Sequence, residues 1–549
     1  MRIILLLFFL FCFGSTLNSQ TALLKYWVQF TDKESTPYSV SDPIEFLSPL
    51  AISLREKFEI PIEIKDLPVD PSYVSGLADI EGVRIIHSSK WFNAVTIELV
   101  DSTYIESVLP IILSSNNVLE LKNVSSYSNA GLIIKESGFE KRKSDSYATI
   151  YGPSYGQIAI HNGQLLHELG LRGEGVQVGV FDSGFDGVNF LSAFATLRDE
   201  GRLKFQYDIV DDDDNVLNGG HHGKSVLSIM TAFMPDSIIG SAPEANYHLF
   251  RTEDGSSEHV TEEDNWIRAL EMADSMGIQL INSSLGYTTF DIEDNSHSYE
   301  DMDGNTTRIS VAADIAASKG MLIVNSAGNS GDDPWFYIGA PADADSILSV
   351  GAVSDKGEYA WFSSQGPSFD GDVKPNVCGV GYQTVYADLT EGIKRGNGTS
   401  FSSPVIAGLT ACLWQAFPEK SNMEIIEAIE NSSHLIGNPN DSLGYGIPDF
   451  FQAFRSLSEN EGFVDSGFIV YPNPFNELLQ IAYPNGEIES ISIVDAMGKL
   501  VYNSTDSLLG EGISVLVLNS EVADLSQGIY YLNFLKEDKV LKAVKIVKN

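Results

Sequence analysis

Cysteine, basic residues and long apolar runs are all scarce in this chain of 549 residues, and each shortage excludes a class of protein. With only three cysteines, a disulfide framework cannot be what holds the fold together. Lysine and arginine number 34 against 75 acidic residues, which gives a formal net charge of −41. Since that charge would repel a phosphate backbone, we expect no nucleic-acid partner.

One apolar run stands out at the N-terminus. It extends from Ile3 to Phe13, follows Arg2, and is followed by small and polar residues. A transmembrane helix needs about 20 apolar residues, so this run is too short to span a bilayer. Its layout is that of a secretory signal peptide. We therefore predict a signal peptide over residues 1–19 and no transmembrane anchor.

The whole chain is 43% hydrophobic, which is enough to bury large cores. After the signal peptide, changes in composition and turn-forming residues divide it into three parts. Residues 20–148 mix strand-like and helical stretches, typical of a small α+β module, and end in a polar linker from Glu136 to Ser146. Residues 149–457 alternate short apolar strands with helical patterns, which predicts an α/β fold, a parallel sheet with helices on both faces. Residues 458–549 are strand-rich and predict a small β-sandwich.

The most informative segment is the turn Gly398-Thr399-Ser400, which leads into Ser403-Pro404 and an apolar stretch. Such a sequence places a serine hydroxyl at the start of a buried helix, where free N–H groups and the helix dipole favour negative charge. The segment taken alone could also be a Gly/Ser cap on an ordinary core helix. Ser400 is a candidate nucleophile only if the chain supplies a base and a group to orient it.

Three other segments supply candidate partners. Asp182 ends an apolar strand and precedes a Ser-Gly turn, so it should lie where α/β folds place their sites. His222 precedes a glycine at the head of an apolar helix, and Asn329 closes a further strand. Each has an ordinary alternative interpretation: a turn cap for Asp182, a surface histidine for His222, and a common loop for Asn329.

Acid, base and serine nevertheless occur in the order Asp182, His222, Ser400, and from about Tyr155 to Phe454 the chain resembles the subtilisin-like serine proteases. The segments that carry the resemblance are Asp182-Ser183-Gly184, His222-Gly223-x-x-Val226, Ser284-Leu285-Gly286, Ala327-Gly328-Asn329, Gly339-Ala340-Pro341, and Gly398-Thr399-Ser400 with Ser403-Pro404.

This resemblance implies a catalytic triad. It also implies that catalysis needs no cofactor. Ser400 would attack a peptide carbonyl, His222 would remove the serine proton and later give it to the leaving amine, and Asp182 would orient the imidazole. The side-chain amide of Asn329 and the N–H of Ser400 would form the oxyanion hole.

It also implies how a protein or peptide substrate binds. An extended chain would pair with the backbone of Ser284-Leu285-Gly286, and Ser326-Ala327-Gly328 would line the opposite wall of the pocket. Lys224 and Ser225 depart from the family's pattern, which usually has Thr-His after the His-Gly pair. A lysine there could alter the local charge without disabling His222.

Acidic segments raise the question of a metal. The carboxylate spacing of Asp301-Met302-Asp303-Gly304-Asn305 is similar to that of a calcium loop, but no terminal Glu follows at the right distance, which excludes an EF-hand. An acidic loop without a ligand is favoured, and a structural calcium stays the alternative. The acids between Glu253 and Asp264 could instead face the substrate cleft.

The flanking parts fit a secreted protease. The N-terminal module is placed like a propeptide that assists folding and blocks the site. The segments Val470-Tyr471-Pro472-Asn473-Pro474-Phe475, Met497-Gly498-Lys499 and Gly528-Ile529-Tyr530-Tyr531 resemble the C-terminal sorting domain of type IX secretion cargo in Bacteroidetes-type bacteria. This resemblance implies the secretion machinery as a partner and a secreted or cell-surface location. An adhesive or carbohydrate-binding β-domain is the alternative.

We therefore predict a secreted serine endopeptidase made as a pre-pro-enzyme. A catalytically silent subtilase scaffold is the first alternative, but it would predict a broken triad or a missing oxyanion Asn. An adhesin whose β-domain carries the function is the second, and the intact triad argues against it.

Overall fold

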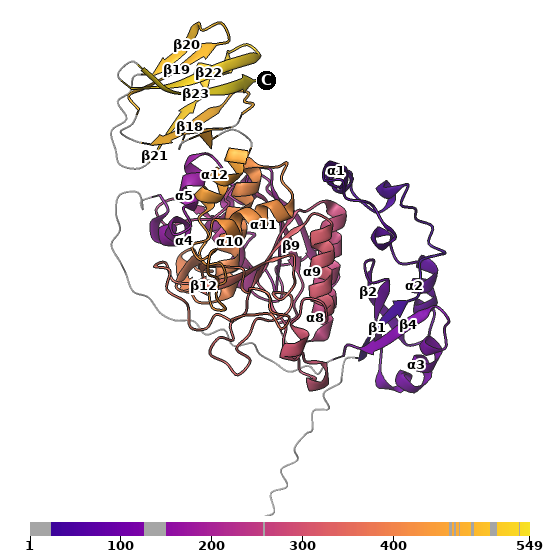
Figure 1. Cartoon of the computed structure of the whole chain (residues 1–549). Coiled ribbons are helices and arrows are strands. Elements are labelled where there is room, and N and C mark those ends of the chain that lie inside the picture. Colours follow the sequence, from indigo (N-terminus) through magenta and orange to yellow (C-terminus); the bar gives the residue numbers. More distant parts are fainter. Residues whose placement is uncertain are drawn as a thin grey trace, which may run out of the picture.

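The computed structural model describes residues 24–125, 150–255, 259–460 and 464–549, the last range without 466–467, 472, 485–487, 505–512 and 537–538. The predicted signal peptide and the predicted linker lie outside the described residues. The rest forms an N-terminal module, a large central domain and a C-terminal strand-rich domain, in that order along the chain (Figure 1).

The N-terminal module contains a four-stranded antiparallel sheet. One face of the sheet packs in the module's own core and the other packs against the central domain. The strands of this sheet lie in the order β2-β3-β1-β4. Successive side chains of a strand point to opposite faces, so Val95 and Ile97 pack in the module's own core while Ala94 packs against the central domain. The elements are β1 (Leu24–Phe30), α1 (Pro49–Lys57), α2 (Pro71–Ala78), β2 (Val83–Ser89), β3 (Ala94–Leu99), α3 (Ile105–Leu113) and β4 (Val118–Asn123).

The central domain is built on a seven-stranded parallel sheet in the order β13-β12-β11-β10-β5-β9-β6, as the βαβ alternation predicts. The strands are β5 (Gln177–Asp182), β6 (Leu203–Asp208), β9 (Asn246–Arg251), β10 (Leu280–Ser283), β11 (Leu322–Ser326), β12 (Leu348–Val353) and β13 (Val377–Val380). The longer helices are α7 (His222–Thr231), α8 (Val260–Met276), α9 (Arg308–Ser318), α10 (Thr399–Ala416), α11 (Asn422–Asn431) and α12 (Phe450–Asn460).

Helices cover both faces of this sheet because its strands are apolar on both sides. Val178 and Val180 of β5 share one core with α7 and α10. The next residue, Phe181, shares the other core with α8 and α9. A short hairpin of β14 (Thr384–Ala387) and β15 (Ile393–Gly396) packs beside α7. Smaller helices are α4 (Tyr155–Ala159), α5 (Gly163–Glu168) and α6 (Ala195–Asp199), and a two-stranded ribbon joins β7 (Phe233–Met234) and β8 (Ile238–Ile239).

The C-terminal domain consists of two four-stranded antiparallel sheets, β16-β17-β18-β21 and β20-β19-β22-β23. Ile481 on β18 and Ile493 on β19 belong to one core, so the two sheets pack face to face as a sandwich. The elements are β16 (Val464–Asp465), β17 (Phe468–Tyr471), β18 (Leu479–Pro484), β19 (Ser490–Asp495), β20 (Leu500–Ser504), β21 (Ile513–Leu518), α13 (Ser520–Ala523), β22 (Gly528–Lys536) and β23 (Lys539–Lys548).

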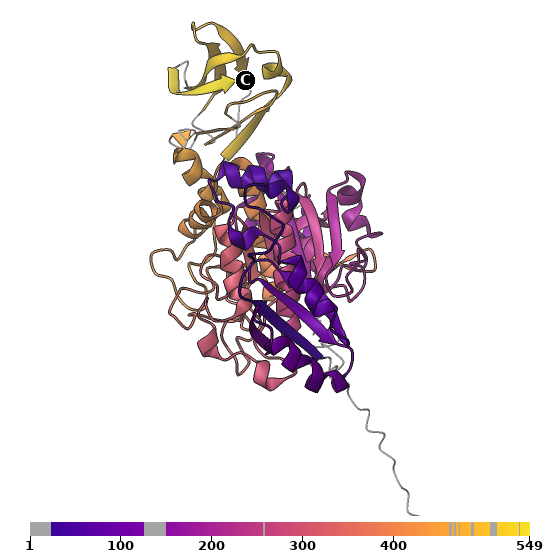
Figure 2. The ribbon, with the colours of Figure 1, turned by 90° about the vertical axis from the view of Figure 1, so that its right-hand side faces the viewer.

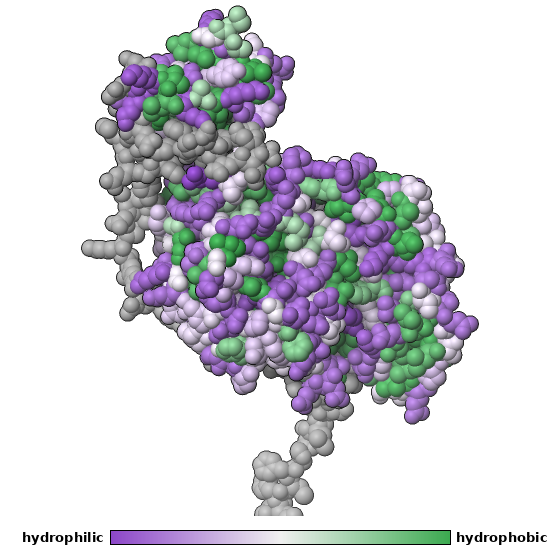
Figure 3. All heavy atoms as spheres, viewed as in Figure 1, coloured by the Kyte–Doolittle hydropathy of each residue, from purple (hydrophilic) through white to green (hydrophobic). Residues whose placement is uncertain are grey.

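The N-terminal module docks on helices α8 and α9 of the central domain (Figures 1 and 2). Buried Glu271 on α8 accepts hydrogen bonds from Ser89 Oγ at 2.5 Å, Lys90 N at 2.8 Å and Trp91 N at 3.0 Å. One turn further along α8, Asp274 pairs with Arg55 at 2.5 Å and with Lys90 at 2.7 Å. On the face shown in Figure 3, hydrophilic and hydrophobic residues of the described part of the chain are interspersed.

Candidate active site

A cleft of about 460 Å³ opens where β5, β10 and β11 end and where α7 and α10 begin. It brings together most of the residues that the sequence analysis singled out, namely His222, Ser284, Leu285, Gly286, Ser326, Gly328, Asn329 and Ser400. Asp182 lies behind His222 and is fully buried. Ala327 is fully buried with Ile338 and Ala342, so its side chain does not line the cleft.

Ser400 occupies the first turn of α10, a long buried helix, as the apolar sequence after it predicts. Pro404 has no N–H, so it cannot make the helical hydrogen bond to the carbonyl oxygen of Ser400 four residues earlier. That oxygen instead accepts a hydrogen bond from Ser284 Oγ at 2.9 Å. The proline therefore leaves a backbone acceptor through which Ser284 fixes the turn of Ser400 to the neighbouring wall.

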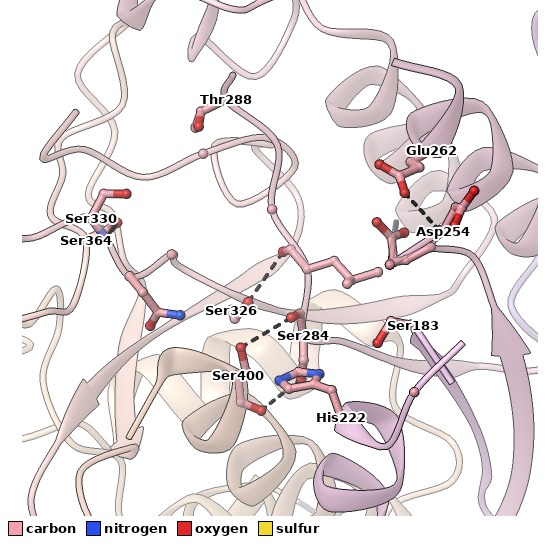
Figure 4. Close-up of a pocket in the computed structure, with 18 of the residues that line it drawn as sticks. Ser183, His222, Asp254, Glu262, Ser284, Thr288, Ser326, Ser330, Ser364 and Ser400 are labelled. Carbon is pink, nitrogen blue, oxygen red and sulfur yellow. Dashed lines mark hydrogen bonds between the residues drawn. The ribbon is translucent and has the colours of Figure 1, made fainter. Parts of the chain in front are cut away.

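The Ser400 hydroxyl lies beside the His222 ring at the foot of the cleft (Figure 4). It donates a hydrogen bond to the carbonyl oxygen of Ser284 at 3.4 Å. Bonds of a nucleophile in the absence of substrate are often long and tighten only when substrate binds. A bond of this length holds the hydroxyl weakly and leaves it able to rotate toward the imidazole.

His222 and Asp182 are joined directly. His222 is the first residue of α7, and its Nδ1 lies 2.8 Å from Asp182 Oδ1 at the end of β5. The same oxygen accepts a hydrogen bond from the N–H of Ser183 at 2.8 Å, which fixes the carboxylate. Because Asp182 occupies Nδ1, the other ring nitrogen, Nε2, is the one available to a substrate or to Ser400.

Burial and charge pull the pKa of His222 in opposite directions. Burial works to lower it, whereas the charge of Asp182 and the hydrogen bond to it work to raise it. The carboxylate prevails, so the pKa of His222 lies above its ordinary value, although the charge of Lys224 acts against this rise. The imidazole is therefore a stronger base than a free histidine.

The orientation of the Asn329 side chain is set by Thr399. Asn329 Oδ1 accepts hydrogen bonds from the N–H of Thr399 at 2.8 Å and from its hydroxyl at 3.0 Å. Both partners donate, so the oxygen must face them, which directs the amide NH₂ group the other way. Asn329 and Ser400 line the same cleft, and a donor is thus held close to the start of α10.

The two walls of the cleft are linked at their base. The carbonyl oxygen of Leu285 accepts hydrogen bonds from Asn325 Nδ2 at 3.0 Å and from Ser326 Oγ at 3.4 Å. Gly286, the next residue, is exposed on the cleft wall. The backbone after β10 is therefore anchored at one residue and accessible at the next.

The ends of the cleft differ in charge. Thr288, Ser330 and Ser364 lie at one end, and Asp254 and Glu262 lie at the other (Figure 4). The sequence analysis anticipated that acids of the 253–264 segment could face the cleft. Glu253, Asp254 and Glu262 line it, whereas Glu263 bonds to His297 and Asp264 to Arg308. The sequence analysis missed Thr288 and Tyr337, which belong to loops without a motif, and Ser330, which directly follows the Ala327-Gly328-Asn329 motif.

In the acidic loop 301–305, whose spacing is similar to that of a calcium loop, the Asp303 carboxylate bonds to nearby residues. Asp303 accepts hydrogen bonds from Asn305 N, Thr306 N and Thr306 Oγ1, which close a turn. A different group of exposed carboxylates could hold a metal ion, because their oxygens lie within 4.8 Å of one another; it consists of Asp345, Asp370 and Asp372.

Three family models match successive parts of the chain. The Subtilase family matches residues 173–447, half of the chain. The Peptidase S8 propeptide domain of Bacteroidota matches residues 25–131, and a secretion system C-terminal sorting domain matches residues 469–549. The domain boundaries predicted from the sequence stay predictions.

Several known proteins are similar to the central domain. Subtilisin E of Bacillus subtilis (strain 168) is 29% identical over 278 residues, which is 50% of this chain and 64% of that protein. Subtilisin of Bacillus pumilus is 28% identical over 278 residues, 50% of this chain and 89% of that protein. Subtilisin Savinase of Lederbergia lenta is 28% identical over 275 residues, with the same two shares. The chain thus spans slightly less than two thirds of the first relative's length.

The crystal structure of MycP1 from Mycobacterium smegmatis is similar to this chain with a TM-score of 0.43 and 20% identity. The similarity covers 60% of this chain and 88% of that one, and it is too distant to carry a conclusion. Among the residues that the structure describes, none of the helices has the length and apolar character needed to cross a membrane.

Proposed function

This chain belongs to the subtilase family, and we propose that it is a secreted serine endopeptidase in which Ser400 is the nucleophile, His222 the general base and Asp182 the group that orients the base. The observation that carries the proposal is the 2.8 Å contact between Asp182 and His222 Nδ1 beside a cleft that Ser400 also lines. A surface histidine or a simple helix cap would give no reason for three distant segments to converge in this way.

The reaction uses groups of this chain alone. His222 takes the hydroxyl proton of Ser400 on Nε2 while the serine oxygen forms a bond to the peptide carbonyl carbon. Asp182 stabilises the imidazolium that results. The proton then passes to the amine nitrogen as the peptide bond breaks, which leaves an acyl group on Ser400. Water attacks that ester with the help of His222 and releases the carboxylic acid and the serine.

The negative charge that develops on the carbonyl oxygen needs donors that are already in place. We assign this role to the Asn329 amide and the N–H of Ser400, at the positive end of the α10 dipole. Thr399 supports the assignment, since it holds Asn329 Oδ1 and so aims the NH₂ group. Fixed donors cost no reorganisation when the charge appears.

Substrate binding would follow the two walls of the cleft. We assign the accessible backbone of Ser284-Leu285-Gly286 to pairing with an extended substrate chain. Ser326-Ala327-Gly328 would form the opposite wall, with Ala327 contributing through its backbone because its side chain is buried. Uncharged residues at one end of the cleft would accept the side chain that precedes the scissile bond.

The sorting domain marks the chain for export by type IX secretion, so the protein is secreted or held at the cell surface. The propeptide domain packs on α8 through buried hydrogen bonds and ion pairs. We propose that the enzyme is made as a zymogen and that removal of this domain precedes activity.

Hydrolysis of a denatured protein tests the proposal. Full-length protein, treated to remove the propeptide domain, should degrade denatured casein, and Ser400→Ala should abolish this activity. Ser402→Ala is the matched control, because Ser402 is buried on the same helix turn and bonds only locally, to the carbonyl of Thr399. If the wild type does not cleave, the silent-scaffold alternative replaces the proposal. If both variants lose activity equally, the assignment of Ser400 as the nucleophile fails.

A further inference from the structure

Lys224 occupies an unusual position in the first turn of α7, two residues after His222. Its side chain is almost fully buried, with a relative exposure of 1%. Its Nζ donates a hydrogen bond to the carbonyl oxygen of Ala387 at 2.8 Å and lies 5.6 Å from the ring centroid of Tyr386. Both partners belong to β14, so the lysine ties the helix of the candidate base to the hairpin beside it.

This placement works against stability. A buried ammonium loses its hydration. The N-terminal turn of a helix is also the positive end of the helix dipole, where acidic side chains are favoured and cations are not. A residue that breaks a local rule of this kind next to a candidate site is expected to have a functional reason.

A stack of aromatic rings connects the lysine to the candidate base. Tyr386, beneath the Lys224 ammonium, stacks on Phe401 with ring centroids 5.2 Å apart and planes at 20°. Phe401 in turn stacks on His222 at 5.9 Å and 29°. Phe401 directly follows Ser400, so the ring that supports the imidazole is fixed to the nucleophile's own helix turn.

The charges around His222 give the lysine a second effect. Burial and the charge of Asp182 act on the pKa of His222 as described above, and the Lys224 cation works to lower it. Helix α7 is packed against β5, β8, β14, α10 and the short helix Ser192–Phe194. The titratable and charged groups that these elements and α7 itself bring to this region are Asp182, His221, His222, Lys224, Tyr386, the adjoining Asp388 and Cys412.

Two of these groups are already committed. The carboxylate of Asp388 pairs with Lys394 at 3.1 Å and accepts the hydroxyl of Thr390. Burial raises the pKa of the Cys412 thiol, which keeps it neutral. Of the groups named, Asp182 works to raise the pKa of His222 and Lys224 works to lower it.

We propose that Lys224 is a positioning residue for the proposed reaction, one that steadies the ring stack behind His222 and holds a positive charge on the same helix turn. The inference rests on the proposed function, since it assumes that His222 acts as the base. Its consequence is that the enzyme keeps a neutral, working base at a lower pH than Asp182 alone would allow.

The pH dependence of kcat/KM of the activated enzyme tests the proposal. Lys224→Met removes the charge and keeps the length of the side chain, and we expect it to move the acid limb of the profile to higher pH. Lys224→Arg keeps the charge and should leave the limb in place. Ser225→Ala is the control at the next buried position of α7 and should also leave it in place. Superimposable acid limbs for wild type and Lys224→Met would overturn the proposal, even if the plateau fell.

A titration that needs no catalysis separates this inference from the proposed function. In the Ser400→Ala background, the imidazole NMR signals of His222 report its pKa directly, and Lys224→Met should raise that pKa. An unchanged titration refutes the role of Lys224, whereas failure of the wild type to cleave refutes the proposed function alone. If Lys224→Met does not fold, Lys224→Gln makes the same comparison, because it is neutral and keeps a donor for Ala387.

Discussion

Glu271 offers the sharpest test of how the propeptide domain is held. Its carboxylate is buried on α8 and accepts three hydrogen bonds from the segment Ser89 to Trp91, two of them from backbone N–H groups. Glu271→Ala removes all three and leaves two buried donors without a partner. At about 1.5 kcal/mol for each bond to a charged group, the loss is ~4.5 kcal/mol, or a factor of ~10³ in the docking equilibrium.

Amide hydrogen exchange measures this change in the intact chain. In the Ser400→Ala background, which keeps the propeptide attached, the amides of Lys90 and Trp91 should lose about 10³-fold in protection when Glu271 becomes Ala. Glu427→Ala, an exposed acid on α11, is the control and should leave protection unchanged. Protection within tenfold of the parent would refute the claim that Glu271 anchors the domain.

Three further predictions concern the site and the docking surface. Asn329→Ala should lower kcat by about 10²–10³-fold with little change in KM, a magnitude known for such a donor in another member of this family. Asp182→Asn should lower kcat by about 10⁴-fold and move the acid limb of the pH profile down, because the pKa of His222 loses its raising charge. Asp264 accepts a hydrogen bond from Thr96 of the propeptide domain. Burial raises the pKa of Asp264 to about 6. The folded state therefore holds a proton that the unfolded chain releases near pH 4, and stability of the docked form should fall as pH rises from about 4 to about 6. Denaturant titrations at both pH values measure this, and Asp264→Asn should remove the dependence.

The architecture of the central domain could be predicted because its signals are local. Strands such as Gln177–Asp182 are apolar on both faces, and that pattern alone indicates a covered parallel sheet. The order of Asp182, His222 and Ser400 could likewise be read along the chain. Asp182 ends a strand, so the sequence also indicated that it lies where α/β folds place their sites.

What escaped prediction depends on contacts between distant segments. No pattern in the sequence indicates that Pro404 frees a carbonyl for Ser284, or that Glu271 receives the hairpin around Lys90. Lys224 was visible as a departure from the family's pattern, but its burial and its contact with Ala387 were not. Side-chain burial in a helix turn is decided by what packs on it, here a hairpin more than 150 residues later.

Covalent labelling of the wild-type protein tests the central claim most directly. After removal of the propeptide domain, a fluorophosphonate should react with the activated serine, and mass spectrometry of the digested adduct should place the label on Ser400. Both Ser400→Ala and His222→Ala should be silent, because the hydroxyl is inert without its base. A label on any other residue, or none on the activated wild type, would contradict the assignment of Ser400 as the nucleophile.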